Sequence, residues 1–185
     1  MNQRRSASSN PSVLWASPAQ ARQVSGRISI EGPVSTATQR ILGWAVDANT
    51  VFVLGSDGNL WFETGPWESV SDTIMSRNQI DSRVMAFQVL DVNTLLVLGT
   101  NGNLWLEVGP WSDVANTIAA RKQIDGSVIQ FWGVDSEHVF VCGSDLNLWF
   151  ETGPWVSVSD TIASRAQWDS NVNDLQPIGE NQILA

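Results

Sequence analysis

The sequence of 185 residues has no tyrosine, one cysteine and one histidine. Because Cys142 has no second cysteine, a disulfide framework and a CxxC metal or redox motif are excluded, and packing alone must hold the fold. No apolar stretch approaches a membrane-spanning length, and the N-terminal MNQRRSASSNPS lacks the apolar core of a signal peptide. We expect no membrane insertion, and the compartment stays open between cytoplasm and secretion without a recognisable signal peptide.

Basic residues are scarce, with 10 Lys and Arg against 19 Asp and Glu and a net charge of -9. Five of the ten lie within the first forty positions, and from Ile41 onward there are five basic and eighteen acidic residues. Such an acidic surface repels nucleic acid and anionic lipid, so we expect neither as a partner.

Residues that carry catalysis are also missing. His138 is the only histidine and has no serine or cysteine nucleophile motif nearby, and no glycine-rich phosphate loop occurs. One histidine and one cysteine do not make an ordinary zinc site, and no spacing identifies a pair of glycosidase carboxylates. The sequence therefore predicts a protein that is not an enzyme and uses no cofactor or metal.

What the sequence does contain is a repeat with a period of 44 residues. Three segments align without gaps: VFVLGSDGNLWFETGPWESVSDTIMSRNQI from Val51, LLVLGTNGNLWLEVGPWSDVANTIAARKQI from Leu95, and VFVCGSDLNLWFETGPWVSVSDTIASRAQW from Val139. The spacing is 95 - 51 = 44 and then 139 - 95 = 44. Repetition at this spacing is typical of propellers and related arrays.

The two ends of the chain carry halves of a fourth copy. SVLWAS (residues 12–17) matches NLWFET and GRISIEG (26–32) matches SRNQIDS, whereas VNDLQPIGENQILA (172–185) matches VMAFQVLDVNTLLV. Each end has the half that the other lacks. We interpret residues 13–185 as a single repeat domain and expect residues 1–12 to be disordered, because they offer no apolar side chains for burial.

Alternating apolar residues predict four short strands in each repeat. In the second full repeat these are Val84–Leu90, Leu95–Leu98, Leu104–Val108 and Arg121–Ile124. Asp57, Asn101 and Asp145 stand where hairpin turns are expected, and a long GPW loop joins the third strand to the fourth.

Four-stranded repeats of this length predict an all-β protein, a small four-bladed β-propeller. The first strand pair (Val13–Ser17 and Arg27–Ile30) would join the last pair (Asp174–Ile178 and Gln182–Leu184) in one composite blade, which removes exposed sheet edges. The alternative is a β-trefoil over residues 41–172. A homo-oligomer whose chains share blades is a third arrangement that the sequence leaves open.

The segments GSDGNLWFE, GTNGNLWLE and GSDLNLWFE resemble the strand-turn-strand core of lectin-type β-propeller repeats with DGNLW-type blades. The repeats do not fit the ricin-type QxW trefoil pattern, and the WD signature of the WD40 class does not recur in them. The resemblance covers only this core of each repeat. It implies a sugar-binding propeller with shallow sites near the blade junctions and glycans or glycoconjugates as partners.

Three repeated residue types are candidate ligand-binding residues. They are the GPW tryptophans Trp67, Trp111 and Trp155, the arginines Arg77, Arg121 and Arg165, and the glutamines Gln79, Gln123 and Gln167. An indole stacks on a sugar face, and guanidinium and amide groups donate to hydroxyls. These residues predict a multivalent carbohydrate-binding protein.

The same residues also suit blade packing. The arginines and glutamines would then form a structural network between blades, together with Glu63, Glu107 and Glu151. This alternative function is a non-catalytic protein-interaction or assembly propeller with purely structural repeats. Exposed GPW tryptophans favour sugar binding, and buried ones favour architecture.

Overall fold

A computed structural model describes residues 42–179 and 182–184, in which each full repeat forms its own four-stranded antiparallel sheet. We call these sheets, with their helices, modules 1 to 3. Module 1 comprises β1 (Leu42–Asp47), β2 (Thr50–Leu54), β3 (Leu60–Thr64), α1 (Val70–Ser76) and β4 (Asn78–Asp81). Module 2 comprises β5 (Val84–Asp91), β6 (Thr94–Gly99), β7 (Leu104–Val108), α2 (Val114–Ala120) and β8 (Lys122–Asp125). Module 3 comprises β9 (Val128–Gly133), β10 (His138–Gly143), β11 (Asn147–Thr152), α3 (Val158–Ser164) and β12 (Ala166–Ser170).

The predicted strands of the second repeat are confirmed to within one residue at each end. The predicted turns are confirmed as well. Asp57, Asn101 and Asp145 each accept a hydrogen bond from the backbone N–H two residues on, at 3.0, 3.1 and 3.1 Å. The all-β expectation holds for the described chain, apart from three helices of seven residues each.

The helices are the feature that the sequence analysis did not predict, because the GPW segment was interpreted as a loop. Ser69, Asp113 and Ser157 cap them, each accepting a hydrogen bond from the backbone N–H three residues on. Asp72, Asn116 and Asp160 occupy that third position, and the Asp72 carboxylate also accepts from the Ser69 hydroxyl at 2.6 Å.

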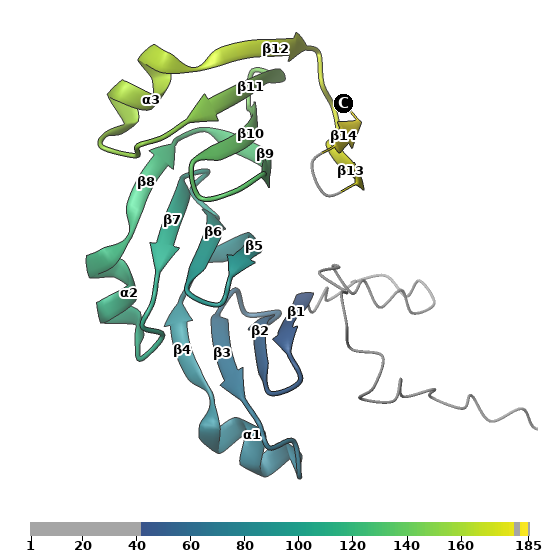
Figure 1. Ribbon diagram of the computed structural model, residues 1–185, viewed down its shortest axis with the longest axis vertical. Helices are drawn as coiled ribbons and strands as arrows, with labels where there is room; N and C mark the ends of the chain where they lie inside the picture. The colour runs from purple at the N-terminus through teal and green to yellow at the C-terminus, as the bar shows by residue number, and fades with distance from the viewer. Residues whose placement is uncertain (1–41, 180–181, 185) are drawn as a thin grey trace, which may run out of the picture.

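The three modules follow one another in a curved array, and the helices α1, α2 and α3 lie along its outer edge (Figure 1). The first strand of each module, β1, β5 and β9, lies on the opposite side. Helices α2 and α3 also contact the last strand of the preceding module, α2 against β4 and α3 against β8. The GPW segment therefore links neighbouring modules.

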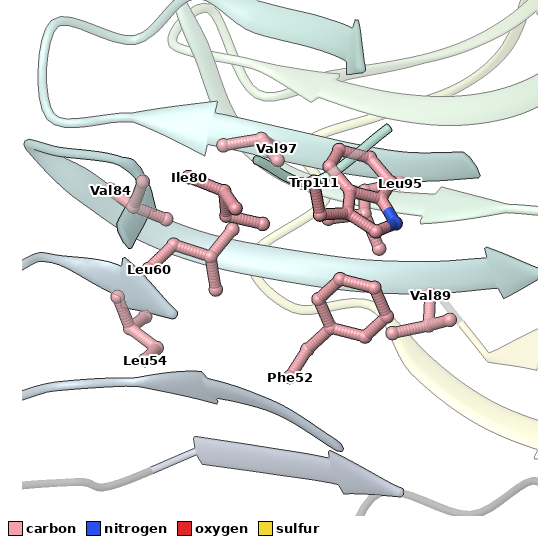
Figure 2. Close-up of a cluster of buried hydrophobic side chains, with 9 residues drawn as sticks. All are labelled: Phe52, Leu54, Leu60, Ile80, Val84, Val89, Leu95, Val97 and Trp111. Carbon is pink, nitrogen blue, oxygen red and sulfur yellow. The ribbon is translucent and has the colours of Figure 1, made fainter. Parts of the chain in front are cut away.

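The core lies between the modules because their central strands bury both faces. On β6, Leu95 and Val97 pack against module 1, whereas Leu96 and Leu98 pack toward module 3. Side chains alternate between the two faces of a strand, so the continuous apolar run of β6 supplies two clusters. Figure 2 shows the first of them, where Trp111 and Leu95 of module 2 meet Phe52 of module 1.

After module 3 the chain forms a hairpin of β13 (Gln176–Gly179) and β14 (Gln182–Leu184). This confirms the predicted last strand pair. The Gln130 side chain on β9 donates to Asp174 at 2.9 Å and accepts from the backbone N–H of Leu175 at 2.9 Å, so the segment directly before the hairpin is anchored to module 3. The predicted strands Val13–Ser17 and Arg27–Ile30, and the segment 1–12, lie outside the described residues.

Candidate functional site

The GPW tryptophans of modules 2 and 3 are buried at the module junctions. Trp111 is 6% and Trp155 is 5% exposed. The Trp111 ring meets Phe52 of module 1 edge to face at 5.5 Å between centroids, and its indole N–H donates to the carbonyl of Val92 at 2.7 Å. Trp155 donates likewise to Ser136 at 2.7 Å. Neither indole offers a sugar a free ring face.

Each repeated arginine stacks on the NLW tryptophan of its own module. The Cζ atoms of Arg77, Arg121 and Arg165 lie 3.9, 4.0 and 3.9 Å from the ring centroids of Trp61, Trp105 and Trp149. Each arginine also follows directly after its helix, as the C-cap residue. Stacking of a planar guanidinium on an aromatic face is favourable and fixes its direction.

The described chain has two complete junctions, one between modules 1 and 2 and one between modules 2 and 3. At each of them the arginine of the later module binds an aspartate of the preceding module. Arg165 Nη1 lies 3.1 Å from Asp125 Oδ2, and Arg121 Nη1 lies 3.5 Å from Asp81 Oδ2. The aspartates are 3% and 4% exposed. These aspartates were not among the predicted site residues, although an Ile-Asp pair after each candidate glutamine was a visible signal in the first two repeats.

A buried glutamate completes each cluster. Glu107 and Glu151 are fully buried, with Oε1 3.8 and 3.7 Å from the Nη1 atoms of Arg121 and Arg165. Burial, together with the adjacent Asp81 and Asp125, raises the pKa of Glu107 and Glu151 to about 9 against the opposing effect of the arginines. The Glu63 pKa is also raised by burial, with Arg77 lowering it.

The hydrogen bonding agrees with neutral glutamates. Within the described residues, no donor hydrogen-bonds either oxygen of Glu107 or Glu151. A buried ionised carboxylate without hydrogen-bond donors is costly, whereas a protonated carboxyl group carries no charge for burial to penalise. Each complete junction therefore contains a neutral glutamate, a negatively charged aspartate and a positively charged arginine.

The candidate glutamines bind within their own sheets. Gln79 donates to Asn59 Oδ1 at 3.0 Å, and Gln167 donates to Asn147 Oδ1 at 3.2 Å. Gln123 donates to the Asp125 carbonyl at 3.3 Å. Each module thus contains one candidate tryptophan, one candidate arginine and one candidate glutamine. In the structure these side chains contact other parts of the protein.

The two ends of the array lack one neighbour each. Trp67 makes the same indole bond as its counterparts, to the Ala48 carbonyl at 2.9 Å, yet it is 44% exposed. Arg77 has no ion pair within 4 Å among the described residues. At the other end, Trp168 is 63% exposed, although Ile80 and Ile124 at the same repeat position are fully buried.

Other candidate chemistry is sparse in the part of the chain that the structure describes. No cluster of three or more His, Cys, Asp or Glu side chains is placed to hold a metal ion there. Cys142 is buried, and burial raises its thiol pKa. The described helices are too short to cross a membrane.

Comparison with known proteins gives no family assignment. No protein-family model and no curated protein matches the chain. A solved structure described as "The de novo evolutionary emergence of a symmetrical protein is shaped by folding constraints" is 15% identical over 64% of this chain and 53% of that one, with a TM-score of 0.42. Human WBSCR16 is 13% identical over 78% of this chain and 45% of that one, also with a TM-score of 0.42. The chain spans about half the length of each, and TM-scores this low assign neither fold nor function.

Proposed function

We propose that this chain is a non-catalytic protein-interaction and assembly module whose repeated tryptophans and arginines are architectural. The observation that carries the proposal is the use of these residues at the two complete junctions. Trp111 and Trp155 are buried with their N–H groups bonded, and Arg121 and Arg165 bind acids of the preceding module. Residues engaged in this way hold modules together and leave no group for a ligand.

The proposed fold of the whole chain is a four-bladed propeller. Each described four-stranded sheet is complete within one repeat, as a blade is, whereas a trefoil joins strands of different repeats in one barrel. The β13–β14 hairpin supplies two strands of a fourth blade, anchored to β9 through Gln130. The N-terminal half-repeat would supply the other two.

The proposed contact surface is a row of isoleucines on the helices. Ile74, Ile118 and Ile162 occupy the same position in every module and are 51%, 45% and 46% exposed. The helices that carry them lie along the outer edge of the array (Figure 1), and none of the three isoleucines belongs to a buried cluster. Repeated apolar exposure outside the core is typical of an interaction surface.

Charge around the isoleucine row supports a basic partner. Asp72, Asp113 and Asp160 lie at the helix starts, and none of the three helices has a basic residue in its last turn. We therefore assign as partner a polypeptide with apolar side chains flanked by lysine and arginine. Opposite charge at the rim of an interface speeds association and loses its effect in salt.

Photo-crosslinking tests the isoleucine row. A photoreactive residue replaces Ile118 in one variant and Met85, which is 47% exposed on β5, in the control. We expect a specific protein adduct from position 118 alone, and the purified partner to bind more weakly to Ile118→Lys and in high salt. Equal adducts from both positions, or none from position 118, would contradict the assignment.

A glycan site at Trp67 is the second candidate function. This indole is the one GPW ring in the described chain with an exposed face, and Arg77 nearby has no ion pair. Glycan-array binding followed by calorimetry tests it: one site per chain, lost in Trp67→Ala, supports this function. Three sites, with one lost for each tryptophan replaced, would instead support the multivalent lectin that the repeat pattern predicts.

A further inference from the structure

The two ends of the array expose complementary halves of one junction. Module 3 ends in Asp169 and Trp168, the counterparts of Asp125 and Ile124, and both are exposed. At the other end of the array, Trp67 of module 1 is exposed and Arg77 of the same module stacks on Trp61. Among the described residues, Asp169 therefore has no arginine from a following module, and Arg77 has no aspartate from a preceding module.

The N-terminal half-repeat carries both missing charges in its sequence. In the alignment of GRISIEG with SRNQIDS, Arg27 corresponds to Arg77 and Glu31 corresponds to Asp81. Leu14 and Trp15 correspond to the Leu-Trp pair on which each arginine stacks. The half-repeat therefore has an arginine to offer the preceding module and an acid to offer the following one.

We propose that residues 12–32 dock between β14 and module 1 of the same chain, pairing Arg27 with Asp169 and Glu31 with Arg77. The docked segment covers Trp168 at one end and Trp67 at the other. This inference rests on the proposed four-bladed form and names the contacts that close it. It reproduces the order of the complete junctions, in which an arginine binds the acid of the module before it.

Chain connectivity favours the same chain over a second copy. Glu31 precedes Leu42 by 42 - 31 = 11 residues, whereas Asp81 precedes Ala86, the counterpart of Leu42, by 86 - 81 = 5 residues. A linker six residues longer than the usual connection still tethers the segment beside module 1. A short tether gives an effective concentration in the millimolar range, which a separate chain does not match in dilute solution.

Charge exchange tests the first pair. The variants are Asp169→Arg, Arg27→Asp and the two combined, with Glu68→Arg as an exposed control, and the readouts are melting temperature and mass by light scattering. We expect each single reversal to lower the melting temperature by about 5 °C and the combination to recover at least half of the loss at the mass of one chain. Glu31→Arg with Arg77→Glu tests the second pair in the same way.

Three results would overturn the proposal: single reversals no worse than the control, a combination no better than the sum of its parts, or recovery only in species of two or more chains. The last would assign the docked segment to a second copy. If a single variant does not fold, acrylamide quenching of Trp168 in the unaltered protein, obtained by difference from Trp168→Phe, still decides. We expect protection, and quenching like that of a free indole would contradict the docking.

The same variants separate this inference from the proposed function. Partner binding at Ile118 is measured alongside, and failed charge exchange with intact partner binding overturns the docking alone. A sugar bound at Trp67 excludes docking on that indole. Glycan binding in the unaltered chain would therefore count against the docked segment.

Discussion

The complete junctions and the open ends of the array use the same residues in different surroundings. Trp67 and Trp111 each donate their indole N–H to a backbone carbonyl nineteen residues earlier, at 2.9 and 2.7 Å. Nevertheless Trp67 is 44% exposed and Trp111 is 6% exposed. The repeat sequence sets the local conformation, and the neighbouring module provides the burial.

The acidic clusters show the same difference. Arg121 and Arg165 each have two acidic partners, one from their own module and one from the module before. Arg77 stacks on Trp61 in the same way but has no described ion pair. Repetition of a residue therefore does not by itself indicate a ligand-binding site. Packing between modules also needs the same residue at the same position of every module.

The largest expected effect concerns the tryptophans at the complete junctions. Trp111→Ala and Trp155→Ala should each lower the free energy of unfolding by about 3–5 kcal/mol, because each leaves a cavity between two modules. Denaturant unfolding measures the loss. A decrease below about 1 kcal/mol would show that these rings contribute little to packing.

Trp67→Ala sharpens that comparison when its cost is measured in two backgrounds. With residues 12–32 docked, the replacement should cost more in the unaltered chain than in Asp169→Arg, where docking is weakened. The difference in unfolding free energy should reach about 1 kcal/mol or more. An equal cost in both backgrounds would show that Trp67 stays uncovered in solution.

Acidic pH should stabilise the complete junctions. Glu107 and Glu151 have pKa values of about 9 in the folded protein and ordinary values near 4.5 when unfolded. Their contribution is therefore fully present below pH 4.5 and is lost as the pH rises toward 9. Unfolding free energy measured across this range should fall with rising pH, by up to about 1.4 kcal/mol per pH unit for each glutamate.

Glu107→Gln isolates the contribution of one glutamate. Glutamine stays neutral at every pH and has an amide N–H that can donate, so the pH dependence should weaken while stability at pH 8 stays equal or rises. Glu137→Gln, at an exposed site, is the control. A loss of several kcal/mol at neutral pH would show instead that an ionised Glu107 binds Arg121.

The smallest expected effect lies in a turn. Gly58 and Gly102 have φ values of 76° and 77°, and Leu146 occupies the same left-handed position in module 3 with a φ of 60°. Leu146→Gly should raise the unfolding free energy by about 1 kcal/mol, because a side chain there is strained. Gly102→Leu should lower it by a similar amount. Equal stability of all three proteins by denaturant unfolding would contradict this account.

Sequence alone predicts the local elements well. The 44-residue period, the strand positions and the hairpin turns at Asp57, Asn101 and Asp145 were all evident, because alternation and turn residues act over short distances. The seven-residue helices were missed because the Gly-Pro-Trp signal outweighed the cap pattern that starts at Ser69, Asp113 and Ser157.

Sequence could not decide between recognition and packing at the candidate site. Arginine over Trp105 suits either use, and only the position of Asp81 across the junction shows which acid it meets. Burial of Glu107 likewise depends on a face contributed by another module. Such contacts join residues about forty positions apart, beyond the reach of local patterns.

A double-mutant cycle on Arg165 and Asp125 tests most directly whether the repeated residues hold modules together. Unfolding free energies are compared for Arg165→Met, Asp125→Asn and the combined variant, with Asp135→Asn, whose carboxylate pairs with His138 on the surface, as the control partner. We predict a favourable coupling of about 1–3 kcal/mol for Arg165 with Asp125 and none with Asp135. Additive losses for Arg165 and Asp125, within about 0.5 kcal/mol, would contradict the account.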